Sequence, residues 1–143
     1  MEGEVHLLRG EEGVAELVID RPAKHNAVTP GMAAAIAAHA AAVDADPDLR
    51  CLLLRGAGER AFCSGTDLNA LAAYPDGWAF RNRSEYSTSI RNMRKPVVVA
   101  MKGWALGGGF EMALAADIRV AGRSLKAGFP EVTRGWVGGG GAS

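Results

Sequence analysis

Three consecutive glycines, Gly107 to Gly109, come directly after an apolar stretch and before a segment of helical character. Because glycine has no Cβ, it leaves backbone N–H groups accessible, and the first N–H groups of a helix have no partner within that helix. The positive end of the helix dipole lies at the same place. This pattern could stabilise a negative charge that develops on a bound molecule. Close packing of a helix against a sheet is the alternative explanation for the glycines.

Two nucleotide-binding motifs rich in glycine do not fit this segment. A dinucleotide fingerprint that starts at Gly107 would require glycine or alanine at the position of Met112. A phosphate loop would require Gly-Lys-Ser or Gly-Lys-Thr after the glycines, which the sequence lacks there. The glycines therefore do not indicate a nucleotide-binding domain.

A second glycine-containing loop, Ala61-Phe62-Cys63-Ser64-Gly65-Thr66-Asp67, follows another apolar stretch. Ligands of α/β proteins bind beyond the carboxyl ends of parallel strands, which is where both loops should lie. Two such loops from one sheet could direct two backbone N–H groups at one atom, which is the geometry of an oxyanion hole. An ordinary turn between a strand and a helix is the alternative.

Two glutamates are candidates for acid–base chemistry near the glycines. Glu111 lies in the first turn of the helix that the glycines begin, and Glu131 follows Pro130 in a loop. Two carboxyl groups at one pocket can act as acid and base if their surroundings separate their pKa values. The alternatives are that Glu111 complements the helix dipole and that Glu131 lies in a solvated turn.

The other reactive side chains give weaker signals. His6, His25 and His39 do not have the spacing of metal ligands, so no metal site is predicted. Cys63 lies in the second glycine loop, but no histidine is near it in the sequence, so we interpret it as structural. The basic loop 21–27 could bind a phosphate or could simply be solvated.

Composition restricts the class of protein further. The chain has 143 residues, 48% of them hydrophobic and 22% charged, and its formal net charge is zero. These values predict one globular domain and give no electrostatic reason to expect nucleic acid or a membrane as a partner. No apolar run approaches the length of a membrane helix, the first residues are acidic rather than signal-like, and two cysteines do not make a disulfide framework. A cytoplasmic location is the expectation.

The periodicity of apolar residues predicts the elements that must position these groups. A hairpin should form from strands 5–8 and 14–19, and a helix should begin at Pro30, after Thr29 as its N-cap. The other predicted elements are strands 51–54, 97–101 and 118–121, a helical turn at 67–72, and helices 78–93 and 110–116. This order predicts an α/β fold with a largely parallel sheet in a single domain, 1–143. The tail 138–143 has the character of a loop that leads into another element, so we expect the domain to be truncated there.

Taken together, these segments resemble the crotonase, or enoyl-CoA hydratase/isomerase, superfamily. The matching segments run in the family's order, at about its spacing, across nearly the whole chain. They are Arg21-Pro22-x-x-x-Asn26-Ala27, residues 61–68, Lys95-Pro96-Val97-Val98-Val99-Ala100, residues 103–111, Ala115-Ala116-Asp117-Ile118-Arg119 and Phe129-Pro130-Glu131-Val132. The resemblance implies an α/β spiral of ββα units with a mostly parallel sheet.

The resemblance also implies a reaction and the residues that carry it. A hydratase of this family adds water syn to a trans-2-enoyl-CoA, and the thioester oxygen would be bound by the backbone N–H groups of Thr66 and Gly108. Glu111 would activate the water and Glu131 would supply the proton. Substrate contacts are implied at Lys24, Ala27, Ser64, Asp67, Leu68, Gly107 and Gly139. No cofactor is implied apart from the coenzyme A of the substrate, and the expected assembly is a homotrimer or a dimer of trimers.

The chain departs from the family pattern in several places. Thr66 replaces a small or apolar residue, Gly138 replaces a common proline, and Phe110 is bulkier than its usual counterpart. Family members are about twice as long. An enoyl-CoA isomerase, an acyl-CoA hydrolase, or a catalytically silent subunit that binds CoA esters or supports assembly therefore remain alternatives to a hydratase.

Overall fold

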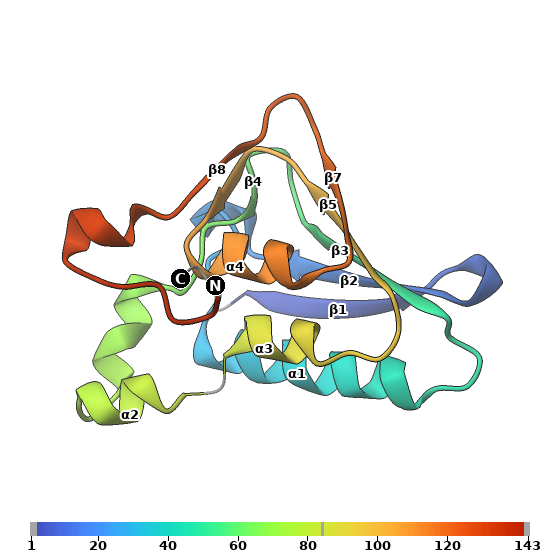
Figure 1. Ribbon diagram of the computed structural model, residues 1–143, viewed down its shortest axis with the longest axis horizontal. Coiled ribbons are helices and arrows are strands. Elements are labelled where there is room, and N and C mark those ends of the chain that lie inside the picture. The colour runs from blue at the N-terminus through green and yellow to red at the C-terminus, as the bar shows by residue number, and fades with distance from the viewer. Residues whose placement is uncertain (1–2, 84, 142–143) are drawn as a thin grey trace.

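The described part of the chain folds into two β-sheets with helices packed against them (Figure 1). The computed structural model describes residues 3–83 and 85–141. The larger sheet has the strand order β1 (Glu4–Arg9), β2 (Val14–Asp20), β3 (Cys51–Gly56), β5 (Val97–Met101) and β7 (Ile118–Ala121). The smaller sheet has the order β4 (Ala61–Cys63), β6 (Trp104–Leu106) and β8 (Lys126–Gly128). β1 and β2 form the predicted antiparallel hairpin, and the strands that follow are paired in parallel, as predicted.

The chain alternates between the two sheets. β3, β5 and β7 of the larger sheet are followed along the chain by β4, β6 and β8 of the smaller sheet. Because neighbouring strands in the smaller sheet are parallel, the turns after β4 and β6 emerge at the same end of that sheet. This arrangement brings together the two glycine loops that are far apart in the sequence.

Helices cover the sheets and fill the space between them. The α-helices are α1 (Pro30–Ala45), α2 (Gly77–Arg81), α3 (Tyr86–Arg91) and α4 (Gly108–Ala115). The short 3₁₀ helices are η1 (Glu11–Gly13), η2 (Pro22–Lys24), η3 (Leu68–Ala73) and η4 (Pro130–Arg134). α1 contacts β1 and β2, while α3 contacts both α1 and α4, as Figure 1 shows. The residues before and within α3 thereby reach the N-terminal end of α4.

Helix α1 begins where the sequence predicts. The side-chain oxygen of Thr29 accepts a hydrogen bond from the backbone N–H of Met32 at 3.2 Å, and Pro30 occupies the first helical position. Met32, Ile36 and Val43 are buried against the sheet. The cap and the buried stripe together explain why local sequence was sufficient to predict this helix.

The predicted helix 78–93 is wrong as a single element. The chain forms two short helices instead, α2 and α3, and Ser84 between them lies outside the described residues. The linking segment carries no apolar side chain that could continue a buried stripe. Arg83 instead forms an ion pair with Glu85 at 2.6 Å, and its guanidinium lies over the ring of Phe80. A helical pattern needs an apolar face to pack, so the helix ends where that face is interrupted.

The strands of the smaller sheet were not predicted. β4, β6 and β8 have three residues each, which is too short for an alternating pattern to be recognised. Helix α4 also begins two residues earlier than expected, because Gly108 and Gly109 are its first residues. The glycine segment is thus the helix N-terminus itself.

One continuous core lies between the two sheets, α1, α3 and α4. Its largest fully buried side chains are Phe62, Leu17, Ile19, Ile36, Leu52, Leu54, Ile90, Met112, Val28, Val43, Val97 and Val99. By contrast, every residue of β7 is exposed. Within residues 3–83 and 85–141, no helix combines the length and the apolar character needed to span a membrane.

Candidate active site

The two glycine loops meet at the N-terminus of α4. Gly65 has a φ of +95°, and a Cβ atom at this position would lie 2.9 Å from the carbonyl oxygen of Leu106 and 3.3 Å from the backbone nitrogen of Gly108. A side chain larger than hydrogen is therefore excluded at Gly65 by both the backbone conformation and the contacts with Leu106 and Gly108. The loop that contains Thr66 lies directly against the loop that contains Gly108.

Both loops present a backbone N–H group that is not used by regular secondary structure. Thr66 forms a parallel bridge with Val28, in which Val28 N–H donates to Gly65 O at 2.8 Å and Asp67 N–H donates to Val28 O at 2.9 Å. In such a bridge the N–H of the central residue points to the opposite side. Gly108 is the first residue of α4, so its N–H has no acceptor within the helix.

Glu111 lies next to these N–H groups on α4. Glu111 is 4% exposed, and its Oε1 accepts a hydrogen bond from the backbone N–H of Gly140 at 2.9 Å. The carbonyl oxygen of Gly140 in turn accepts a hydrogen bond from Ser87 Oγ at 3.3 Å. A Cβ atom at Gly140 would lie 2.4 Å from Glu111 Oε2, so the glycine-rich tail packs directly on the carboxylate. Helix α3 and the tail together hold Glu111 in place.

Glu131 reaches the same glycine segment from η4. A Cβ atom at Gly107 would lie 2.9 Å from Glu131 Oε1, which places this carboxyl group against the first glycine. Its other oxygen, Oε2, is buried and has no hydrogen-bond partner among the described residues. A buried carboxyl oxygen without a partner is costly, so such an atom is suited to a proton or to a bound molecule.

A third carboxyl group, Glu85, lies near the site and was not predicted. Burial raises the pKa of Glu85, the positive charge of Arg83 lowers it, and the negative charge of Glu111 raises it again. A Cβ atom at Gly139 would lie 3.9 Å from Glu85 Oε1, so the expected substrate contact at Gly139 lies beside this carboxylate. No motif in the sequence marks Glu85, because its position depends on the break between α2 and α3.

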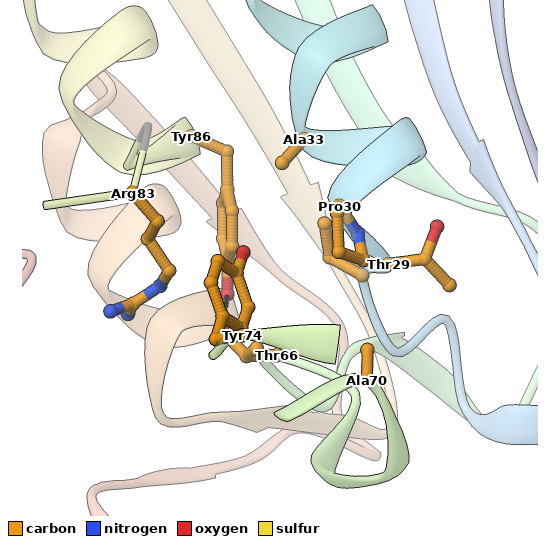
Figure 2. Close-up of a pocket in the computed structure, with 9 residues that line it drawn as sticks. Thr29, Pro30, Ala33, Thr66, Ala70, Tyr74, Arg83 and Tyr86 are labelled. Atoms are coloured by element: carbon orange, nitrogen blue, oxygen red, sulfur yellow. Dashed lines mark hydrogen bonds between the residues drawn. The ribbon is translucent and has the colours of Figure 1, made fainter. Parts of the chain in front are cut away.

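Tyr86 is a second side chain at the site that the sequence did not single out. It is 2% exposed, and its hydroxyl oxygen lies 3.3 Å from Thr66 Oγ1. Tyr86 and Thr66 line a small pocket at the start of α1, together with residues that include Tyr74 and Arg83 (Figure 2). Burial raises the pKa of the Tyr86 phenol above its usual range, so the hydroxyl stays protonated.

The expected substrate contacts fall into separate groups. Lys24 is exposed, and its carbonyl oxygen lies 3.5 Å from Ser64 Oγ, while the neighbouring Ala27 accepts a hydrogen bond from Arg21. A shallow hollow beside Ser64 is lined by His25, Ser64, Trp104 and Leu106. Leu68 is 42% exposed at the start of η3. These residues border the loop 61–67, whereas Gly107 and Gly139 lie with the glutamates.

Asp67 and Asn26 tie the loops of the site together. Asp67 Oδ2 accepts a hydrogen bond from Arg21 Nη1 at 2.6 Å, and the buried Asn26 donates from Nδ2 to the carbonyl oxygens of Ala61 and Phe62. The hydrogen bond from Arg21 is the main cause that lowers the pKa of Asp67. In the structure, the Asp67 carboxylate is thus occupied by a contact within the protein.

The Asp67 ion pair leads to a prediction about stability. We expect Asp67→Asn to lower the free energy of unfolding at neutral pH by about 3–5 kcal/mol, because it leaves the largely buried Arg21 without its carboxylate. Since the folded-state pKa of Asp67 is lowered, its stabilisation is present above the unfolded pKa of about 3.9 and is lost as the pH falls through the folded value.

Denaturant unfolding of the full natural polypeptide between acidic and neutral pH measures this effect. The parent and Asp67→Asn should converge in stability at low pH. Asp48→Asn, at an exposed position, serves as the matched control and should follow the parent throughout. A constant difference between the parent and Asp67→Asn at all pH values would contradict the electrostatic explanation.

The thiol of Cys63 is not a candidate nucleophile. Cys63 is buried, and burial raises the pKa of its thiol to about 12, which makes it a poor nucleophile. Its carbonyl oxygen would lie 2.3 Å from a Cβ atom at Gly109, so β4 packs closely on α4. Among residues 3–83 and 85–141, no group of three or more His, Cys, Asp or Glu side chains is placed to hold a metal ion.

Comparison with known proteins places this arrangement in a family. The sequence profile described as enoyl-CoA hydratase/isomerase matches residues 9–143. The chain is 36% identical to (E)-benzylidenesuccinyl-CoA hydratase of Thauera aromatica over 83% of its own length and 47% of the relative. It is 41% identical to mevalonyl-coenzyme A hydratase of Beauveria bassiana over 87% of its own length and 48% of the relative. The chain therefore spans about half the length of these relatives.

Solved structures agree with the sequence comparison. An enoyl-CoA hydratase from Bacillus anthracis superposes with a TM-score of 0.86 at 26% identity, covering 96% of this chain and 54% of the other. An enoyl-CoA hydratase/carnitine racemase from Magnetospirillum magneticum has the same TM-score at 28% identity, covering 93% and 51%. These matches confirm the expected crotonase-like fold. The chain belongs to the enoyl-CoA hydratase/isomerase family.

Proposed function

We propose that the protein containing this chain is an enoyl-CoA hydratase, which adds water syn to the double bond of a trans-2-enoyl-CoA. The observation that carries the proposal is that both glutamates touch the same glycine segment. Glu111 donates its backbone N–H to Gly107 O at 2.9 Å, and the carboxyl group of Glu131 lies against the α-carbon side of Gly107. The Glu131 carboxyl group thus lies beside the glycine segment that holds the Gly108 N–H, and Glu111 follows in the first turn of the same helix.

The first step uses the backbone of the two glycine loops. The thioester oxygen accepts hydrogen bonds from the N–H groups of Thr66 and Gly108, which lie on two loops that pack against each other. These donors stabilise the negative charge that develops on this oxygen as electrons move away from the double bond. Because both donors are backbone groups, their position is set by the fold and needs no reorganisation during the reaction.

The two glutamates divide the proton transfers. Glu111 takes a proton from water as the water oxygen forms its bond to C3 of the enoyl group, and the electron pair of the double bond moves into the thioester enolate. Protonated Glu131 then gives its proton to C2, which restores the carbonyl group. The buried Oε2 of Glu131, which has no partner among the described residues, supports this role because it is an atom that could carry the transferred proton.

A panel of CoA thioesters tests the reaction class. With the full natural polypeptide, we expect hydration of crotonyl-CoA, followed by the loss of enoyl-thioester absorbance and by product mass. Double-bond migration in a 3-enoyl-CoA and hydrolysis of a saturated acyl-CoA should be slower by at least about tenfold, because the two-carboxylate arrangement serves water addition. Faster turnover of a 3-enoyl-CoA would identify an isomerase, and binding without turnover of any thioester would identify a silent subunit.

A further inference from the structure

Tyr86 occupies the space between the two residues whose N–H groups bind the thioester oxygen in the proposed reaction. Its side chain extends from α3 toward Thr66, as Figure 2 shows, with its hydroxyl 3.3 Å from Thr66 Oγ1. On the other side, a Cβ atom at Gly108 would lie 2.2 Å from the Tyr86 hydroxyl oxygen and 3.0 Å from its Cζ. The phenol is therefore in contact with both halves of the proposed oxyanion hole.

The hydroxyl groups of Tyr86 and Thr66 can together donate one more hydrogen bond than the contact between them uses. Each hydroxyl carries one proton and can both donate and accept, and the hydrogen bond between them uses only one of the two protons. The other proton is free for an acceptor at the site. A phenol is a much stronger acid than an aliphatic alcohol, so the phenol is the better donor to an anion. The favourable arrangement has Thr66 Oγ1 donate to Tyr86, and Tyr86 donate to the acceptor.

We propose that the Tyr86 hydroxyl donates a third hydrogen bond to the thioester oxygen, with the Thr66 hydroxyl orienting it. This inference rests on the proposed function. It explains why threonine stands at position 66, where only a backbone N–H is required and a small or apolar side chain would suffice. It also accounts for the glycine at position 108, because a Cβ atom there would lie 2.2 Å from the phenol oxygen.

The expected effect of Tyr86 is on the transition state rather than on binding. The thioester oxygen is neutral in the bound substrate and negative in the enolate, so a donor aimed at it is worth most when the charge is present. The buried phenol keeps its proton throughout the working pH range, because burial disfavours the phenolate. Removing one donor from an oxyanion hole typically lowers kcat by about 10²–10³-fold.

Tyr86→Phe in the full natural polypeptide tests the proposal. We expect kcat for crotonyl-CoA hydration to fall by about 10²-fold with KM changed by less than about threefold. Ser89→Ala is the control, because it removes a hydroxyl group from the same helix outside this pocket and should leave kcat near the parent value. Thr66→Val should lower kcat through misorientation of the phenol, and Thr66→Ser, which retains a hydroxyl, should restore it.

Ligand binding separates a hydrogen-bond donor from a packing residue. Acetoacetyl-CoA can bind as an enolate, which is followed by its near-ultraviolet absorbance, while an S-alkyl-CoA thioether has no carbonyl oxygen. Tyr86→Phe should reduce the enolate signal and leave the affinity for the thioether unchanged. Equal weakening of both ligands would overturn the proposal in favour of a packing role.

The outcomes distinguish this inference from the proposed function. If the parent hydrates crotonyl-CoA and Tyr86→Phe keeps both kcat and the enolate signal, the role of Tyr86 is refuted while the hydratase assignment stands. If the parent does not hydrate crotonyl-CoA but does bind acetoacetyl-CoA as its enolate, and Tyr86→Phe loses the enolate signal, the third donor is supported and the reaction class is refuted. If the parent binds neither thioester nor thioether, both proposals are refuted.

Discussion

Replacing Glu111 or Glu131 by glutamine is expected to lower kcat for hydration of crotonyl-CoA by about 10²–10⁴-fold in each case. Glutamine has the same shape but cannot take a proton from water or give one to carbon. In the Glu111→Gln variant, the side-chain amide oxygen can still accept the hydrogen bond from Gly140 N–H, so the contact between the tail and α4 should persist. The loss should therefore appear in the chemical step, measured by steady-state kinetics on the full natural polypeptide, with little change in the free energy of unfolding.

The double variant Glu111→Gln/Glu131→Gln sharpens this prediction. Groups that act as one unit give non-additive losses, so the double variant should be only slightly slower than the worse single variant. Glu59→Gln is the matched control, because Glu59 is an exposed glutamate that forms an ion pair with Lys102. Full activity in either single variant would refute the two-carboxylate assignment. Loss in Glu131→Gln alone would instead favour an isomerase mechanism.

The second large effect is expected from Gly108→Ala. The backbone conformation of Gly108 is one that alanine also adopts, but the new methyl group would lie 2.2 Å from the Tyr86 hydroxyl. Tyr86 is almost fully buried and cannot move aside without disturbing the core. We expect the N-terminus of α4 to shift, so that the N–H groups of Thr66 and Gly108 can no longer bind the thioester oxygen as proposed, and kcat should fall by about 10²-fold or more.

Gly128→Ala is the control for this substitution. Gly128 ends β8, and a Cβ atom there would have no neighbour within 4 Å, so alanine should be accommodated without loss of activity. The measurement is kcat together with the enolate absorbance of bound acetoacetyl-CoA, which reports on the thioester oxygen directly. Wild-type kcat in Gly108→Ala would mean that the N-terminus of α4 does not bind that oxygen.

Much of the fold could be predicted because long elements carry their own signals. The Thr29-Pro30 start and the apolar stripe of α1 lie within one stretch of sequence, and the run Val97–Met101 shows a buried strand directly. The three-residue strands of the smaller sheet carry no such signal, because their pairing depends on chain that is distant in sequence. Helix 78–93 was predicted in one piece since Tyr86 and Ile90 do share a buried face, which continues only through α3.

The sequence by itself determined the family, through motifs whose order and spacing run across the chain, and it marked Glu111, Glu131 and the two glycine loops as the candidate site. Only the tertiary structure revealed what surrounds them: the Tyr86 phenol between Thr66 and Gly108, the Gly140 N–H on Glu111, and Glu85 nearby. The physical reason is that periodicity reports whether one face of an element is buried, whereas contacts between residues 20 or more positions apart depend on the path of the whole chain.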